Sequence, residues 1–147
     1  LSLVGSEMCI RDRSMAVAAA LLSASPALAG DLTLSLTTEA SGGRIAIAVY
    51  RDAESLRRNA GAVRTAMVDR TGPVTTTTLT DLEPGRYVVA VFHDTDGNGR
   101  LSTWPIGLPK EAYGFSRNAR GRFGPPSFED AAFDLPATGS RQAITLR

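Results

Sequence analysis

Arg86-Tyr-Val-Val-Ala-Val-Phe-His93 is the most apolar run in the part of the chain that we expect to fold. A short apolar run bounded by turn signals is typical of a strand covered on both faces, so we expect the central strand of a sheet here. The turn residues Leu82-Glu-Pro-Gly85 come immediately before it. Before this turn, residues 73–80 are rich in β-branched threonine and predict a second strand.

Other strand patterns lie on both sides of this pair. Residues 31–37 alternate apolar and polar side chains, and residues 44–50 alternate large and small apolar ones, with the hairpin-type turn Ser41-Gly42-Gly43 between them. The remaining expected strands are the weaker 62–68 and the C-terminal 132–135 and 142–146, and a short helical turn is expected at 54–59. Seven short strands without a substantial helix predict an all-β fold, a single two-sheet antiparallel β-sandwich.

The first thirteen residues have an explanation outside protein folding. Ser2-Leu-Val-Gly-Ser-Glu-Met-Cys-Ile-Arg-Asp-Arg13 is the translation of a transposase adapter used to prepare sequencing libraries, so we expect residues 1–13 to be a translated sequencing-adapter artefact. The only cysteine, Cys9, lies in this segment. We therefore expect neither a disulfide nor a thiol nucleophile in the folded domain.

Residues 14–29 have the pattern of a truncated signal peptide. Met15 to Leu22 is apolar and has the length of a signal h-region, and Ala27-Leu28-Ala29 is an A-x-A cleavage site. The apolar run is too short to span a bilayer. We expect export to the periplasm or the medium and one β-sandwich domain over residues 30–147.

The charge balance gives no reason to expect nucleic acid as a partner. The 16 basic and 15 acidic residues leave a net charge of +1, and the basic residues are spread along the chain. We expect a monomer without a membrane span, whose partner is an envelope ligand or protein.

One long segment, residues 94–130, carries no strand pattern and many glycine and proline residues. Loops of this length are usually functional or disordered. The segment also contains five aromatic residues, in which disordered regions are poor. We expect an ordered excursion packed over one end of the sandwich, with Phe123 and Phe128 anchoring it to the core.

The excursion opens with Asp94-Thr-Asp-Gly-Asn-Gly-Arg-Leu-Ser102, which resembles the first nine positions of a twelve-residue calcium loop. Oxygen ligands alternate along such a loop because the backbone curls around the ion. The glycine of position 6 is Gly99. The candidate ligands of Ca²⁺ at positions 1, 3, 5, 7 and 9 are Asp94, Asp96, Asn98, the carbonyl of Arg100, and Ser102.

The match fails at position 12, where Pro105 has no carboxylate. The closing ligand must come from elsewhere, and Glu111 is the first choice, followed by Glu129 and Asp130. The alternative is a polar turn without an ion, because Asp-Gly and Asn-Gly are also common turn dipeptides. With an ion, the site would hold the excursion to the sandwich.

Two other kinds of chemistry remain open. His93, the only histidine, could act as a general base with Glu111 or Asp130, or could be a structural hydrogen-bonding residue. No second histidine completes a zinc site, and no Gly-x-Ser-x-Gly elbow surrounds Ser116 or Ser127. A saccharide or peptide surface is a further hypothesis, and its candidate residues are Trp104, Lys110, Glu111, Tyr113, Phe115, Arg117 and Arg122.

Two resemblances to known proteins add to these expectations. Residues 82–89 resemble the strand entry of transthyretin-like and carboxypeptidase-regulatory-like sandwiches, which implies an inward Tyr87 ring whose hydroxyl bonds near the corner. The blocks 93–101, 107–116 and 123–131 resemble the bacterial exported domain-of-unknown-function family 2141. This second resemblance covers about 32–147 and implies export, one domain and an ordered long loop, but no catalytic residues. The sequence departs from the family at two positions. The family often has glycine where Ala112 stands, and it often has an acidic residue near the position of Ser102.

Overall fold

The computed structural model describes residues 29–147. The expected adapter segment and all but the last residue of the expected signal peptide lie outside the described residues. No helix within residues 29–147 is long and apolar enough to cross a membrane.

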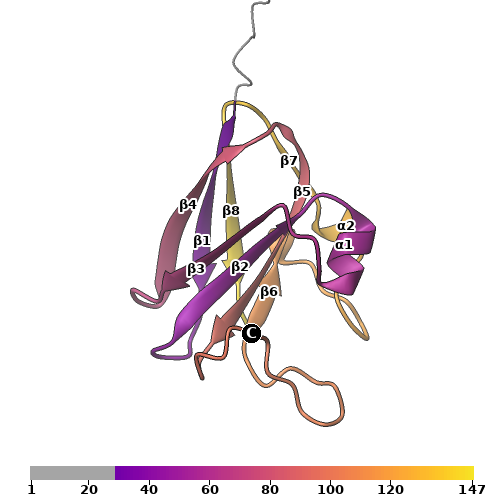
Figure 1. Cartoon of the computed structure of the whole chain (residues 1–147). Coiled ribbons are helices and arrows are strands. Elements are labelled where there is room, and N and C mark those ends of the chain that lie inside the picture. The colour runs from indigo at the N-terminus through magenta and orange to yellow at the C-terminus, as the bar shows by residue number, and fades with distance from the viewer. Residues whose placement is uncertain (1–28) are drawn as a thin grey trace, which may run out of the picture.

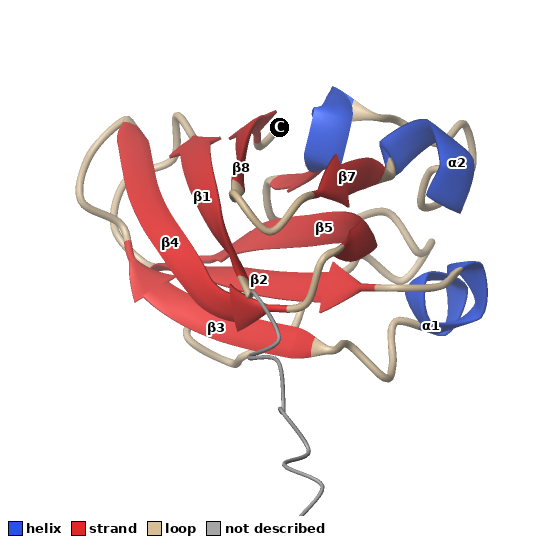
Figure 2. Ribbon diagram, turned by 90° about the horizontal axis from the view of Figure 1, so that it is seen from above, coloured by secondary structure: helices blue, strands red, loops and turns tan. Residues whose placement is uncertain are grey.

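Two β-sheets pack face to face, which confirms the predicted all-β sandwich (Figure 1; Figure 2). The smaller sheet has the order β4-β1-β8 and consists of β1 (Gly30–Thr37), β4 (Val74–Leu82) and β8 (Ser140–Thr145). The larger sheet has the order β3-β2-β5-β6, with β7 also paired to β5. Its strands are β2 (Arg44–Tyr50), β3 (Arg64–Asp69), β5 (Gly85–Asp94), β6 (Tyr113–Phe115) and β7 (Phe133–Leu135).

Strand β5 is the centre of the larger sheet, as its apolar sequence predicts. It pairs with β2 along one edge, while β7 and β6 share the other edge at Gly85–Tyr87 and Ala90–Phe92. Both of its faces are buried, because Val89 and Val91 face the core between the sheets and Val88 joins a second cluster. That second cluster is covered by the short helices α1 (Ala53–Arg58) and α2 (Phe128–Ala131).

The connection between β1 and β2 corrects one prediction. Residues 41–43 are not a hairpin turn, because β1 and β2 belong to different sheets. Both edges of β1 are already occupied, one by β4 and the other by β8, so β2 has no edge to pair with. The pairing of β1 with β8 is parallel, so the sandwich is mixed rather than purely antiparallel.

The long segment 94–130 is ordered, but it is not free of strands. It contains β6, the 3-10 turn η1 (Ser116–Asn118) and helix α2. Strand β6 has only three residues and a central glycine, too short for an alternating pattern, and it forms because β5 offers it an open edge. The expected helical turn at 54–59 is confirmed as α1, where the Asp52 carboxylate caps the helix by accepting the Ser55 N–H at 2.8 Å.

Tyr87 behaves as the resemblance to transthyretin-like sandwiches implies. Its ring is 2% exposed and packs in the core between the sheets. Its hydroxyl donates a 2.7 Å hydrogen bond to the carbonyl of Glu83. This bond joins β5 to the turn that crosses from β4 into the other sheet.

Candidate metal centre

Asp94 organises the loop that follows β5. It is the last residue of that strand and is 2% exposed. One carboxylate oxygen, Oδ1, accepts the backbone N–H of Gly97 at 2.8 Å, and the other, Oδ2, accepts that of Gly99 at 2.8 Å. Both glycines have φ near +70°, the left-handed region that disfavours other residues. The loop therefore curls around its own first carboxylate.

The remaining members of the predicted set form a second layer of contacts. Asp96 Oδ2 accepts the Asn98 amide and the Ser102 hydroxyl, each at 2.9 Å, while Asp96 Oδ1 accepts the Asn98 backbone N–H at 3.1 Å. The hydrogen bonds from the Asn98 backbone and the Ser102 hydroxyl hold the pKa of Asp96 below its ordinary value. Arg100 contributes its backbone N–H, which donates to Asn98 Oδ1 at 2.7 Å.

Glu111 joins the two ends of this loop. It is 7% exposed and lies two residues before β6. Its Oε1 accepts the backbone N–H of Thr95 at 2.9 Å, and its Oε2 accepts that of Ser102 at 2.9 Å. Carboxylate oxygens of Glu111, Asp94 and Asp96 lie within 4.8 Å of one another. The structure therefore brings the first-choice closing residue to the loop.

The two alternatives to Glu111 have other partners. Glu129 pairs with Arg86 across 2.8 Å between Oε2 and Nη1. The carboxylate of Asp130 accepts the Ser127 hydroxyl at 2.6 Å, at the start of α2. Neither residue belongs to the carboxylate cluster among residues 29–147.

A hairpin between Ser102 and Lys110 explains how Glu111 reaches the loop. The Lys110 N–H donates to the Ser102 carbonyl at 2.8 Å, and Thr103 and Pro109 form a β-bridge just beyond this pair. Nearer the tip, the Trp104 N–H donates to the Leu108 carbonyl at 2.7 Å. This hairpin projects past the end of the sandwich (Figure 1). At the base of the hairpin Lys110 lies beside Ser102, so the next residue, Glu111, lies beside the loop.

Chemically, the cluster is a group of hard oxygen donors with unbalanced negative charge. None of the three carboxylates forms an ion pair with a basic side chain in the described part of the chain. Calcium takes six to eight oxygen ligands, and carboxylates and amide carbonyls are among the groups that suit it. The cluster could hold a metal ion.

His93 has the contacts of a structural residue. It is fully buried, its Nδ1 lies 3.3 Å from the Thr38 hydroxyl, and its Nε2 lies 2.6 Å from the Gly42 carbonyl. A carbonyl only accepts, so Nε2 carries a proton, and in the neutral ring Nδ1 then accepts from the Thr38 hydroxyl. Both ring nitrogens are occupied, which leaves no free nitrogen to take a proton from a substrate. The hydrolytic hypothesis gains no support from this geometry.

The proposed saccharide or peptide surface is divided between several places. The Lys110 Nζ lies 4.6 Å from the centre of the Trp104 ring, on the hairpin. Tyr113 and Phe115 form an edge-to-face pair with ring centres 6.1 Å apart. Arg117 donates instead to the Ala132 carbonyl at 3.4 Å.

The two expected loop anchors differ from each other. Phe128 packs against the buried cluster beneath α2, as predicted. Phe123 does not anchor the loop, because its side chain is fully exposed. It stands at a bend, followed by Gly124 and two prolines.

The sequence matches one family of bacterial proteins. Residues 37–144 match the family described as "Uncharacterized protein conserved in bacteria (DUF2141)". The chain belongs to this family. The match confirms the resemblance drawn from the three sequence blocks and spans both sheets and the carboxylate cluster. Comparisons with curated proteins and with solved structures give no match.

The sequence interpretation missed the roles of two residues, one in the candidate metal centre and one in the core. Thr95 donates both its N–H and its hydroxyl to Glu111 Oε1, at 2.9 and 3.2 Å. Ser116, judged only as a nucleophile, is a fully buried bridge that accepts the Val89 N–H at 3.0 Å and donates to the Ala131 carbonyl at 2.6 Å. Nothing in the sequence pattern marks either role, because both depend on long-range pairing.

Proposed function

We propose that this domain is an exported, non-enzymatic binding or structural module of the bacterial envelope, in which a calcium ion holds the long excursion to the sandwich. The observation that carries the proposal is the convergence of Asp94, Asp96 and Glu111 on one point. The first two residues follow the spacing of a calcium loop, and the third replaces its missing closing carboxylate. Export rests on the signal-type sequence at residues 14–29.

The location of the cluster supports a structural role for the ion. Asp94 ends the central strand, and Glu111 precedes β6, which pairs with the same strand. An ion bound to both would tie the start of the excursion to its return. Because two of the carboxylates are nearly buried, a divalent cation would also offset repulsion that solvent screens poorly.

Thermal unfolding in calcium and in EDTA tests the proposal. Calcium at about a hundredfold excess over its Kd should stabilise the protein by about 2.7 kcal/mol, which corresponds to a rise in Tm of about 10 °C. Asp94→Ala should abolish the shift, whereas Asp134→Ala, an exposed position on β7, should retain it. If Asp94→Ala does not fold, Asp96→Asn replaces it, because Asp96 is exposed and its substitution should also reduce the shift in Tm. Equal Tm values of the wild type in EDTA and calcium would contradict the proposal.

A second candidate function is the binding of an envelope saccharide or peptide by the hairpin tip. It is favoured by the exposure of apolar side chains there, since Trp104 is 54% and Ile106 80% exposed. Pulldown with peptidoglycan and with envelope glycans tests this function. Capture by the wild type and loss with Trp104→Ala supports it, and equal capture of both proteins contradicts it.

A further inference from the structure

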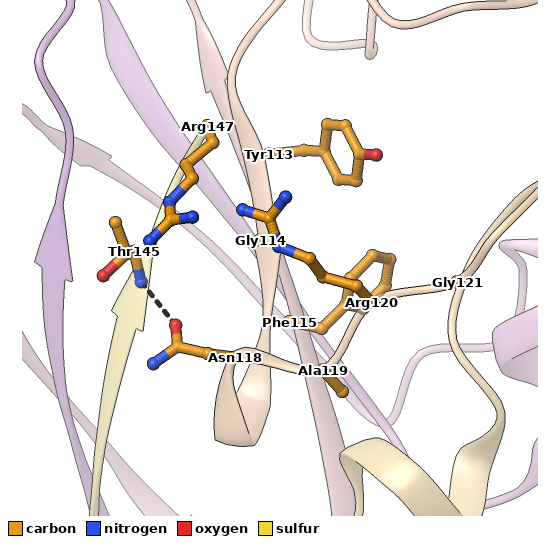
Figure 3. A pocket seen from close by; sticks show the side chains of 9 residues that line it. All are labelled: Tyr113, Gly114, Phe115, Asn118, Ala119, Arg120, Gly121, Thr145 and Arg147. Atoms are coloured by element: carbon orange, nitrogen blue, oxygen red, sulfur yellow. Dashed lines mark hydrogen bonds between the residues drawn. The ribbon is translucent and has the colours of Figure 1, made fainter.

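A cavity of about 300 Å³ lies beside β6, at the side where this strand approaches β8. Aromatic, amide and guanidinium side chains surround it (Figure 3). The residues that matter for its chemistry are Tyr113, Phe115, Asn118, Arg120 and Arg147. The cavity uses none of the three clustered carboxylates, so it is a site separate from the candidate metal centre.

Backbone pairing holds the two strands that border the cavity. Tyr113 and Arg147 exchange two backbone hydrogen bonds, at 3.1 and 3.0 Å. At the other end of the cavity, the Asn118 side-chain oxygen accepts the Thr145 N–H at 2.9 Å (Figure 3). The strands are also close enough that a Cβ at Gly114 would lie 2.9 Å from the Thr145 carbonyl oxygen. The cavity is therefore formed before any ligand arrives.

The turn that supplies Asn118 adopts an unfavourable backbone. Arg117 and Asn118 have φ values of 58° and 52°, so two successive non-glycine residues are left-handed. Such conformations persist when the surrounding structure enforces them, and they gather at ligand sites. Here the turn directs the Asn118 side chain to the edge of β8 and leads the chain to Arg120.

The charged side chains that line the cavity are all positive. Arg120 and Arg147 both line it, and in Figure 3 the guanidinium group of Arg120 lies beside Gly114 and that of Arg147 beside Thr145. No aspartate or glutamate side chain lines the cavity, and neither arginine forms an ion pair within residues 29–147. Guanidinium groups are suited to bidentate contact with planar carboxylates and with phosphates.

We propose that this cavity binds a small ligand bearing a carboxylate or phosphate group. Arg120 and Arg147 hold the oxyanion, and the rings of Tyr113 and Phe115 contact the rest of the ligand. Ligand pockets range upward from about 300 Å³, so the ligand has the size of a single sugar or amino-acid unit. This function goes beyond the calcium-held scaffold and does not depend on an ion.

Titrations followed by calorimetry at constant ionic strength test the proposal with three probes: inorganic phosphate, N-acetylalanine with a free carboxylate, and the amide of N-acetylalanine. We expect at least one of the two anions to bind and the amide not to bind. Binding of phosphate alone identifies a phosphate ligand, and binding of N-acetylalanine alone identifies a carboxylate ligand. Failure of both anions, or equal binding of acid and amide, overturns the proposal.

The variants Arg120→Ala and Arg122→Ala form a matched pair, because Arg122 is an exposed arginine two residues away that does not line the cavity. Arg120→Ala should weaken anion binding about tenfold or more, the effect of losing a charged hydrogen bond. Arg122→Ala should change it less than about twofold. Equal weakening by both variants would reveal only general attraction to a basic surface and would overturn the assignment. Both variants should keep the Tm of the wild type and its shift with calcium. A difference in anion binding between them then cannot come from a difference in folding.

Discussion

Glu111→Gln separates the role of Glu111 as a hydrogen-bonding brace from its role as an ion ligand. The substitution keeps the volume of the side chain and removes one charge. Without an ion, it relieves repulsion with Asp94, which is about 3.5 kcal/mol for unit charges at the observed limit of 4.8 Å and an effective dielectric constant of about 20. The repulsion counts nearly in full because both side chains are almost buried.

The hydrogen bonds of Glu111 oppose this gain. The backbone N–H groups of Thr95 and Ser102 each lose a charged acceptor, and one of them then faces an amide NH₂ that cannot accept. Weaker bonds and one unsatisfied donor together cost about 2–4 kcal/mol. The two effects nearly cancel, so Glu111→Gln should change the free energy of unfolding by no more than about 1.5 kcal/mol in EDTA.

Calcium should separate the variant from the wild type. At about a hundred times the wild-type Kd, the ion adds about 2.7 kcal/mol to the wild type. If the loss of a carboxylate ligand raises Kd about a hundredfold, the variant gains only about 0.4 kcal/mol at the same concentration. We therefore expect the two proteins to differ by about 2 kcal/mol more in calcium than in EDTA.

Urea unfolding at fixed calcium and in EDTA measures this difference directly. Glu129→Gln is the matched control, because Glu129 is exposed and pairs with Arg86 far from the cluster. The control should lose less than about 1 kcal/mol, equally in both buffers. An equal loss for Glu111→Gln in both buffers would refute the ion-ligand role and leave only a brace.

Three further predictions concern two buried hydrogen-bonding side chains of the sandwich and the Asp96 carboxylate. Ser116→Ala should destabilise the protein by about 2–4 kcal/mol in urea unfolding, because two buried backbone groups lose their partner; a loss below about 1 kcal/mol would contradict this. Tyr87→Phe should cost about 1 kcal/mol by removing the hydrogen bond to Glu83, and no change would show that this corner bond adds nothing to stability. Because the folded pKa of Asp96 is lowered from 3.8, its stabilisation is present above that value and is lost as the pH falls through the folded pKa. Unfolding from about pH 5 to about pH 2.5 should therefore have a weaker pH dependence in Asp96→Asn, and identical dependence would refute the assignment.

The strands could be predicted from the sequence, but some of their partners could not. A sequence pattern reports which faces of a strand are buried. The alternation at residues 31–37 predicts one buried face for β1, and the apolar run at 86–93 predicts two for β5, as the structure shows. Alternation does not report which edge a strand uses. The parallel β1–β8 pair and the crossing between β1 and β2 are decided by competition for edges. Strand β6 escaped prediction for the same reason, since it exists only against β5.

Within the candidate site, local contacts were predictable and the closing residue required a spatial argument. The curl around Asp94 follows from two glycines at fixed offsets, which the sequence displays. A strict twelve-residue spacing would have rejected the loop at Pro105. The structure instead inserts a hairpin whose base pairs Ser102 with Lys110, so the count along the chain does not measure the distance to Glu111. A loop of this kind is better recognised by its opening residues together with any later carboxylate that a hairpin can return to it.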